Sequence, residues 1–392
     1  MEKIRTHLQS YHQAPDPRQI DVLDGVRALC VLLVGWFHIW QQGWLSPSFS
    51  VLGIDFHLDF LLRSGYIWVD GMLLLSGFLL YLPYTQGKSS PAIWPFYKRR
   101  LIRILPSYLL CIIPLFILAI LQGKYATPWA AGRDLLAHLT FTHNLFPFSY
   151  HHTPLNGALW TLGVEMQFYL IFPFLARAFK KFPLITWGLM AGAAFAFRSL
   201  AAQQRDLSMY FNQLPAFLDV YANGFLAASM FTALRKKLGQ GETDKKIKLL
   251  FTVLFFLCIC QLVAIAKGQA SASHIQKGQL ERRFSLSLTL SCAMLCAAFS
   301  LPGLRFLLGN PVMKFFSAIS FQFYIWHQLF AVQLKGWGFP PSQSASPWTA
   351  GEYRWQVNYT LCCFIGAIIL ASLITYLFER PIARRLRRGM RP

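Results

Sequence analysis

Charged residues are scarce in this sequence. Only 14% of its 392 residues are Asp, Glu, Lys or Arg, and the acidic residues number just 16. A soluble domain carries about 25% charged residues, so this composition excludes an ordinary water-soluble fold. Instead, 55% of the residues are hydrophobic and 16% are aromatic. They occur in long runs, which is typical of a protein that has a lipid bilayer as its solvent.

Metal-binding cysteine motifs and a cleavable signal peptide are also missing. The eight cysteines all lie inside apolar runs without paired C-x-x-C spacing, so we interpret them as small buried hydrophobic residues and expect no metal site. Residues 1–20 are polar, whereas a signal peptide places its apolar stretch there. The first apolar run is therefore expected to remain as a membrane helix.

Ten apolar runs are long enough to cross about 30 Å of hydrocarbon. The sequence thus predicts an all-α integral-membrane protein, a bundle of about ten transmembrane helices. We expect residues 1–21 to form a cytoplasmic N-terminal segment, 22–380 the transmembrane domain and 381–392 a basic cytoplasmic tail. The runs span residues 22–42, 64–84, 104–122, 157–177, 182–201, 214–234, 249–266, 284–301, 314–334 and 357–378.

The net charge of +21 comes from 37 Lys and Arg residues, a balance that in a soluble protein indicates nucleic-acid binding. Here the basic residues form short clusters between apolar runs, so we expect no nucleic-acid partner. With the N-terminus inside, 25 of the 37 lie in inner segments, 11 lie in outer segments, and Arg27 lies within the first run. Because cytoplasmic loops are enriched in Lys and Arg, the sequence predicts a multi-pass protein of the cell membrane with both termini in the cytoplasm.

Ionisable residues inside apolar runs are costly to bury and are often functional. Arg27 and His38 lie eleven residues apart in the first run, which places them on one helix face, about 16 Å apart along the axis. Arg27 is then near the inner surface and His38 is in the outer half. The alternative is structural: Arg27 reaches to the interface and His38 bonds to a neighbouring carbonyl.

Five more residues are candidates for the same site. Asp70, Glu165 and His327 are expected in the outer half, where a lone carboxylate must be paired or protonated. Each is also open to a structural role in helix pairing. Arg100 and Arg103 lie one helical turn apart on the inner side. Guanidinium forks suit phosphate recognition, and the alternative is an ordinary positively charged inner loop.

Six short motifs follow one another between positions 22 and 381. They are the Arg27–His38 pair, Leu75-Ser-Gly-Phe-Leu, Arg100-x-x-Arg103, Leu159-Trp-Thr-Leu-x-x-Glu165-x-Gln-Phe-Tyr, Tyr324-x-Trp-His327 and Glu379-Arg-Pro381. In this order they resemble the acyltransferase-3 family. Members of that family are ten-helix membrane enzymes that transfer acetyl or other short acyl groups from coenzyme A to cell-surface glycans, lipids and small molecules.

The resemblance implies an acyltransferase without a bound cofactor, with acyl-CoA as co-substrate and a lipid bilayer around it. Carried over by position, it makes His38 the catalytic histidine and Glu165 an active-site carboxylate. It makes Arg27, Arg100 and Arg103 contacts to the donor. We also place Asp70 and His327 among the substrate- and donor-binding residues.

The expected chemistry is general-base catalysis on an acceptor hydroxyl by His38, with its basicity supported by Glu165. An acyl-histidine intermediate is the alternative. Three positions depart from the family pattern: Met72-Leu73 replace two Phe, Thr161 replaces Ser, and Gln328-Leu329 follow His327 where Pro is common. These departures leave the acyl group and the acceptor open.

Two outer segments are further candidates for contact with substrates. Residues 123–156 contain four histidines but only Asp134 as a nearby carboxylate, so a loop that shapes the acceptor site is favoured over a metal site. Lys335-Gly-Trp-Gly-Phe-Pro-Pro offers aromatic surface either for stacking on sugar rings or for anchoring at the interface. The four histidines are His138, His143, His151 and His152.

A transporter or exporter of an anionic or sugar substrate is the alternative function, because intramembrane Asp, Glu and His also form proton relays. Broken helices in two related halves are expected of such a protein, and no repeat of that kind is evident. A purely structural protein leaves the alignment of Arg27 with His38 unexplained. The sequence therefore favours acyl transfer to a hydroxyl of a glycan, glycolipid or other small acceptor.

Overall fold

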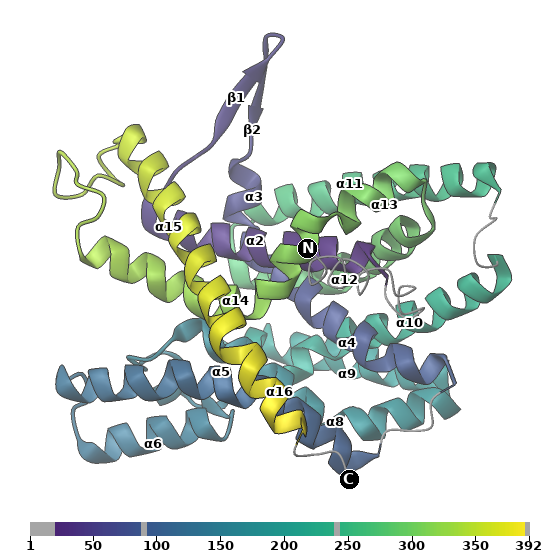
Figure 1. Ribbon diagram of the computed structural model, residues 1–392, viewed down its shortest axis with the longest axis horizontal. Coiled ribbons are helices and arrows are strands. Elements are labelled where there is room, and N and C mark those ends of the chain that lie inside the picture. The colour runs from purple at the N-terminus through teal and green to yellow at the C-terminus, as the bar shows by residue number, and fades with distance from the viewer. Residues whose placement is uncertain (1–19, 88–91, 239–243, 389–392) are drawn as a thin grey trace, which may run out of the picture.

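The computed structural model describes residues 20–87, 92–238 and 244–388. These residues are almost entirely helical and carry one antiparallel hairpin (Figure 1). Most of the expected N-terminal segment 1–21 and the last residues of the tail 381–392 lie outside the described residues. The predicted all-α fold class is confirmed.

Long helices form the body of the protein, and shorter elements connect them. The long helices are α2 (Val22–Gly43), α4 (Val69–Thr85), α5 (Ile93–Leu121), α8 (Trp160–Lys181), α9 (Pro183–Ala201), α10 (Leu218–Leu238), α11 (Lys245–Ala270), α12 (Ile275–Phe299), α14 (Pro311–Gly336) and α15 (Tyr353–Leu373). The shorter elements are β1 (Ser48–Val51), β2 (Ile54–His57), α3 (Asp59–Arg63), α6 (Pro128–Leu139), α7 (Pro147–Tyr150), α13 (Pro302–Gly309), a π-helical turn (Ile374–Glu379) and α16 (Arg380–Arg388).

Each of the ten predicted runs coincides with one long helix. Within the described residues, eight helices are long and apolar enough to cross a membrane, or nine when α12 and the α13–α14 pair, bent by 116°, count as one span. Helices α12 and α14 are not apolar enough to be counted individually as membrane spans, and they are more polar than we expected from the sequence. Their polar side chains, such as Arg283 and Gln322, are turned into the protein and fully buried.

Helix α2 lies at the centre of the bundle and packs against α4, α14 and α15. A glycine makes the closest of these contacts possible, because a Cβ at Gly35 would lie 2.8 Å from Cζ of Phe323 on α14. Helices α4 and α10 approach each other in the same way, since a Cβ at Gly224 would lie 2.6 Å from the Leu74 carbonyl oxygen. Small residues at such contacts are typical of helix packing in membranes.

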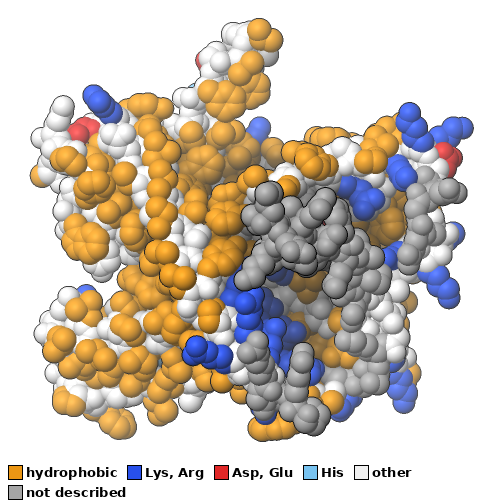
Figure 2. Space-filling model, in the orientation of Figure 1, with side chains coloured by type: hydrophobic (Ala, Val, Ile, Leu, Met, Phe, Trp, Pro, Cys, Tyr) orange, Lys and Arg blue, Asp and Glu red, His pale blue; other side chains and the backbone are white. Residues whose placement is uncertain are grey.

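The peripheral helices turn apolar side chains outward. Leu189 on α9, Leu257 on α11 and Ile365 on α15 are each more than half exposed, and much of the visible surface is hydrophobic (Figure 2). A soluble monomer rarely exposes patches of this extent. This surface therefore fits contact with lipid, and the chain is a multi-pass membrane protein.

Most helices run from left to right in Figure 1, so their ends gather at the two sides of the view. The end of α10 and the start of α11 lie at the right in Figure 1, where Lys and Arg side chains gather in Figure 2. The α5–α6 turn and the loop before α15 lie at the left. The β1–β2 hairpin, with Ser48 opposite His57, stands away from the helices.

Candidate active site

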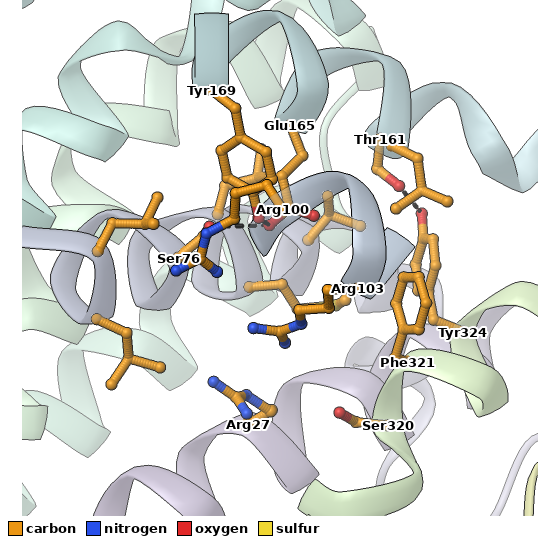
Figure 3. Close-up of a pocket in the computed structure, with 16 residues that line it drawn as sticks. Arg27, Ser76, Arg100, Arg103, Thr161, Glu165, Tyr169, Ser320, Phe321 and Tyr324 are labelled. Atoms are coloured by element: carbon orange, nitrogen blue, oxygen red, sulfur yellow. Dashed lines mark hydrogen bonds between the residues drawn. The ribbon is translucent and has the colours of Figure 1, made fainter. Parts of the chain in front are cut away.

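A pocket of about 160 Å³ is enclosed by residues of α2, α4, α5, α8 and α14. Arg27 of α2 reaches into it from one side, and Arg100 and Arg103 of α5 reach into it from another (Figure 3). Glu165 of α8 borders the same space. The structure thus brings together four of the seven predicted site residues, and we call this cavity the arginine pocket.

Positive charge dominates the arginine pocket. Among the described residues, no carboxylate oxygen lies within the 4 Å of an ion pair from Arg27, Arg100 or Arg103. The guanidinium of Arg100 lies 5.5 Å from the centre of the Tyr169 ring, at cation–π distance. Three cations in a partly buried cavity favour an anionic ligand, because the low dielectric strengthens their field.

Glu165 is held by hydrogen bonds within this pocket. Its Oε1 accepts a hydrogen bond from Ser76 Oγ at 2.9 Å and another from the Tyr169 hydroxyl (Figure 3). The structure does not bring Glu165 against His38, which borders a different cavity. The direct support of His38 by Glu165 that we expected from sequence is therefore not the observed arrangement.

His38 borders a second, larger pocket of about 430 Å³, which we call the amide pocket. Its lining combines aromatic rings with side-chain amides, and among the described residues it has no carboxylate. The rings are Phe37, Trp40, Tyr66, Trp160, Phe211 and Tyr324, and the amides are Gln41, Asn212, Gln269, Gln276 and Gln279. The lining also includes Arg63, whose Nη1 lies 3.4 Å from Asp59 Oδ2. Rings that stack and amides that both donate and accept suit a ligand rich in hydroxyl groups.

The hydrogen bonds of the two neighbouring histidines fix which nitrogen can act as a base. His38 Nδ1 lies 3.1 Å from Gln41 Oε1, so Nδ1–H donates and Nε2 keeps a free lone pair. His327 is fully buried, and its Nδ1 lies 2.9 Å from the Phe323 carbonyl oxygen. The His38 and His327 ring centres are 5.2 Å apart. The structure thus brings these two predicted residues together, although His327 itself lines neither pocket.

The two pockets meet at Val69 of α4 and Tyr324 of α14, which line both of them. The Tyr324 hydroxyl accepts a hydrogen bond from Thr161 Oγ1 at 2.8 Å and donates one to the Ala158 carbonyl oxygen at 3.0 Å. The side chains of Val69 and Tyr324 are at most 4% exposed. Val69 and Tyr324 therefore form a fixed wall between the arginine pocket and the amide pocket.

Asp70 lies next to Val69 in sequence but lines neither pocket. Its Oδ2 is 3.1 Å from Nε of Arg283, and both side chains are fully buried. Arg283 also donates to the Phe211 carbonyl oxygen at 2.9 Å, and Phe211 lines the amide pocket. Asp70 thus connects to the site through the segment that precedes α10.

The histidines of segment 123–156 fall into two groups. His138 and His143 are buried with stacked rings 4.4 Å apart, and His138 Nδ1 lies 3.3 Å from Asp134 Oδ1. His151 and His152 are exposed. Among the described residues, no group of three or more His, Cys, Asp or Glu is placed to hold a metal ion.

Sequence reasoning missed three residues of this site. Gln41 follows His38 by three positions, a spacing that puts the two side chains on one helix face, so a signal for it was present. Tyr324 stands inside a motif that we noted for His327. Val69 gives no signal in the sequence, because its place between the pockets depends on how α4 packs against α2 and α8.

The amino-acid sequence matches one family model and is similar to several known proteins. The acyltransferase-domain model of the acyltransferase-3 family matches residues 20–378. O-acetyltransferase OatA of Staphylococcus aureus is 32% identical over 182 residues, which are 42% of this chain and 26% of OatA. The putative peptidoglycan O-acetyltransferase YrhL of Bacillus subtilis is 24% identical over 391 residues, 95% of this chain and 56% of YrhL.

The chain is also similar to a protein of an animal. The regulator of hypoxia-inducible factor 1 of Caenorhabditis elegans is 28% identical over 183 residues, 42% of this chain and 36% of that protein. The matched regions thus cover from about a quarter to just over half of the length of these curated relatives. No solved structure matches the chain.

Proposed function

Because this chain belongs to the acyltransferase-3 family, whose model covers residues 20–378, we propose that it transfers an acyl group from acyl-CoA to a hydroxyl of a cell-surface glycan. The acyltransferase class follows from the family. The donor and the acceptor are inferred from the two pockets. The observation that carries the proposal is the meeting of an arginine pocket with a His38-bearing amide pocket at one wall.

The arginine pocket fits the donor. Coenzyme A carries phosphates, and guanidinium groups bind phosphate through charge-assisted, often bidentate hydrogen bonds. Arg27, Arg100 and Arg103 supply three such groups with no carboxylate in ion-pair contact among the described residues. Glu165, held by Ser76 and Tyr169, keeps its proposed place in the active site and balances part of this positive charge.

The amide pocket fits the acceptor. Aromatic rings and amides recognise sugar hydroxyls without needing charge on the ligand. OatA and YrhL are named as O-acetyltransferases, and the name of YrhL specifies peptidoglycan. These names support a cell-wall glycan as the acceptor and acetyl as the acyl group.

His38 is placed to act as the general base. Its Nε2 takes the proton of the acceptor hydroxyl while that oxygen attacks the thioester carbonyl carbon. The C–O bond forms, the C–S bond breaks, and the imidazolium returns the proton to the departing thiolate. An acyl-histidine intermediate fits the same placement of His38. Asp70 and His327 act in this proposal by positioning α4 and His38.

The charge distribution gives the direction of the reaction. With both chain ends in the cytoplasm and α12 and α14 each crossing the membrane, Arg27 lies toward the inner surface and His38 about 16 Å farther out. Acyl-CoA then enters from the cytoplasm, and the acceptor meets His38 from the outer side of the cell membrane.

Thiol release tests the proposal against a transporter. The purified protein in detergent is supplied with acetyl-CoA and soluble peptidoglycan fragments, and both free CoA thiol and acetylated fragments are measured. An acyltransferase forms both products, and His38→Ala removes both. A transporter binds or moves its ligand without cleaving the thioester, so intact acetyl-CoA after prolonged incubation would reject the proposal.

A further inference from the structure

Val69 and Tyr324 are placed where the two substrates have to meet. Each residue lines the arginine pocket on one side and the amide pocket on the other. If the donor lies among the arginines and the acceptor beside His38, the thioester carbonyl must reach this wall. The side chains of the wall then contact the acyl group during transfer.

The wall is rigid because both residues are buried and Tyr324 is tied by its hydroxyl. Thr161 Oγ1 donates to that hydroxyl at 2.8 Å (Figure 3). The hydroxyl in turn donates to the Ala158 carbonyl oxygen at 3.0 Å. Thr161 lies in the first turn of α8 and Ala158 in the short turn just before that helix, so the ring cannot swing away without breaking two buried hydrogen bonds. Such bonds are costly to break, because each buried group is left without a partner.

We propose that Val69 and Tyr324 set the length of the acyl group that this enzyme transfers, admitting an acetyl group and excluding longer chains. The inference rests on the proposed function, since it takes acyl-CoA as the donor. During the reaction the sulfur stays on the arginine side and the attacking hydroxyl comes from the His38 side. The carbon chain of the acyl group must therefore occupy the space between Val69 and Tyr324.

Close packing makes this space selective. Protein interiors are packed as densely as organic crystals, so an added methylene has to displace Val69 or the tied ring of Tyr324. A pocket that fits its ligand discriminates about 10–200-fold per methylene. Two added methylenes, as in a butyryl group, should thus lower kcat/KM by at least about a hundredfold relative to acetyl.

Variants with smaller side chains at the wall, which enlarge the space for the acyl group, test the inference. Thiol release is measured with acetyl-, butyryl- and hexanoyl-CoA for the wild type, Val69→Ala and Tyr324→Leu, so that transfer to water and to soluble peptidoglycan fragments are both counted. We expect the butyryl-to-acetyl ratio of kcat/KM to rise at least about tenfold in each variant. Tyr324→Phe keeps the bulk of the ring but loses both hydrogen bonds that hold it, so the ratio should rise by less than in Tyr324→Leu.

A matched control separates the wall from general loosening of the core. Val31→Ala removes the same two methyl groups from a residue of α2 that is 1% exposed and lines neither pocket, and its ratio should stay at the wild-type value. Unchanged ratios in both Val69→Ala and Tyr324→Leu, with acetyl transfer intact, would overturn the inference alone. Equal wild-type rates with all three donors would also overturn it. No thiol release from any donor in the wild type would instead sink the proposed function itself.

Discussion

His38 is the residue on which the proposed chemistry depends most directly. Its Nδ1 is occupied by Gln41, and its ring borders the amide pocket beside the wall formed by Val69 and Tyr324. Arg27 lies eleven residues earlier on the same helix and belongs to the other pocket. In the proposed function, one helix face serves both substrates, so we expect mutations of Arg27 and His38 to have separate effects.

We predict that His38→Ala lowers turnover by at least about a hundredfold, because a positioned general base contributes about 10²–10⁴ in rate. Donor affinity should persist, since the arginine pocket is left intact. CoA affinity and thiol release are to be measured on the same purified sample. His57→Ala, which changes an exposed histidine of β2, is the control. Near wild-type transfer by a folded His38→Ala protein would leave His327 as the next candidate base.

Arg103→Ala and Arg100→Ala test donor binding. We predict that each raises the donor KM by one to two orders of magnitude, which corresponds to about 1.5–3 kcal/mol for a hydrogen bond to a charged group. Arg99→Ala is the matched control, because Arg99 is exposed and does not line the pocket. Steady-state kinetics with acetyl-CoA provide the measurement. An unchanged KM in both variants would reject the assignment.

At the scale of elements, buried ion pairs join different helices. Asp70 of α4 pairs with Arg283 of α12, and Arg198 of α9 pairs with Asp219 of α10 at 2.6 Å. Both arginines also donate to the Ala216 carbonyl oxygen, at 3.2 Å and 3.3 Å. This network holds the segment before α10 against the amide pocket.

We predict that Asp70→Asn destabilises the folded protein by about 3–5 kcal/mol, because it leaves the charge of Arg283 buried without its counterion. Asp59→Asn is the matched control. It breaks the more exposed Asp59–Arg63 pair, 3.4 Å apart, and an exposed pair contributes about 0–1 kcal/mol. Thermal unfolding in detergent compares the two variants. Equal unfolding temperatures would show that the buried pair adds no more than the exposed one.

The segment between α5 and α8 should make the protein sensitive to acid. Burial, together with the neighbouring His138, lowers the pKa of His143 to about 3. The pKa of Asp134 is also lowered: burial opposes this change, but hydrogen bonds from His138, Tyr125 and Thr153 outweigh it. The unfolded chain therefore takes up a proton on His143 near pH 6.5, whereas the folded protein does not until about pH 3.

The contribution of His143 to the free energy of unfolding is consequently fully present above about pH 6.5 and is lost as the pH falls toward 3. The contribution of Asp134 is lost at lower pH, as the solution passes through its depressed pKa. We predict that the unfolding temperature drops between about pH 7 and pH 5, and that His143→Phe, which keeps a stacking ring, reduces the drop. His152→Phe, at an exposed position, should retain it. An equal drop in His143→Phe would rule out this histidine as the cause.

At the scale of the whole molecule, the arrangement of the helices implies two chemically distinct ends. Lys and Arg side chains gather near the end of α10 and the start of α11, and the α5–α6 turn lies at the other side of the molecule (Figures 1 and 2). Because cytoplasmic segments are enriched in basic residues, we predict that the first end faces inward. In the proposed function, this orientation gives the arginine pocket to a donor that enters from the cytoplasm.

Cysteine labelling from outside the cell tests this orientation. In a background without the native cysteines, we predict that an impermeant maleimide reacts with a cysteine at His152 and not with one at Lys237, both of which are exposed positions. Permeabilised cells, in which both sites should react, provide the control. The reverse pattern would reverse the proposed entry of the donor.

The sequence by itself determined the features that depend on local geometry. Long apolar runs require helices in a bilayer, because the backbone must satisfy its own hydrogen bonds there. A helix also has a fixed twist and rise, so the eleven residues between Arg27 and His38 define one face and a separation along it. Arg100 and Arg103 lie three residues apart on one helix, so the same helix geometry places their side chains next to each other. These features agree with the family to which the chain belongs.

Only the tertiary structure decided which helices meet and which faces they turn toward each other. It put Glu165 with the arginines, gave His38 a partner in Gln41, and paired Asp70 with Arg283, 213 residues away. The wall of Val69 and Tyr324 likewise exists only because α4 and α14, which both pack against α2, line the same two pockets. Helix rotation and approach depend on close contacts between distant segments, such as Gly35 against α14, and no local pattern encodes such contacts.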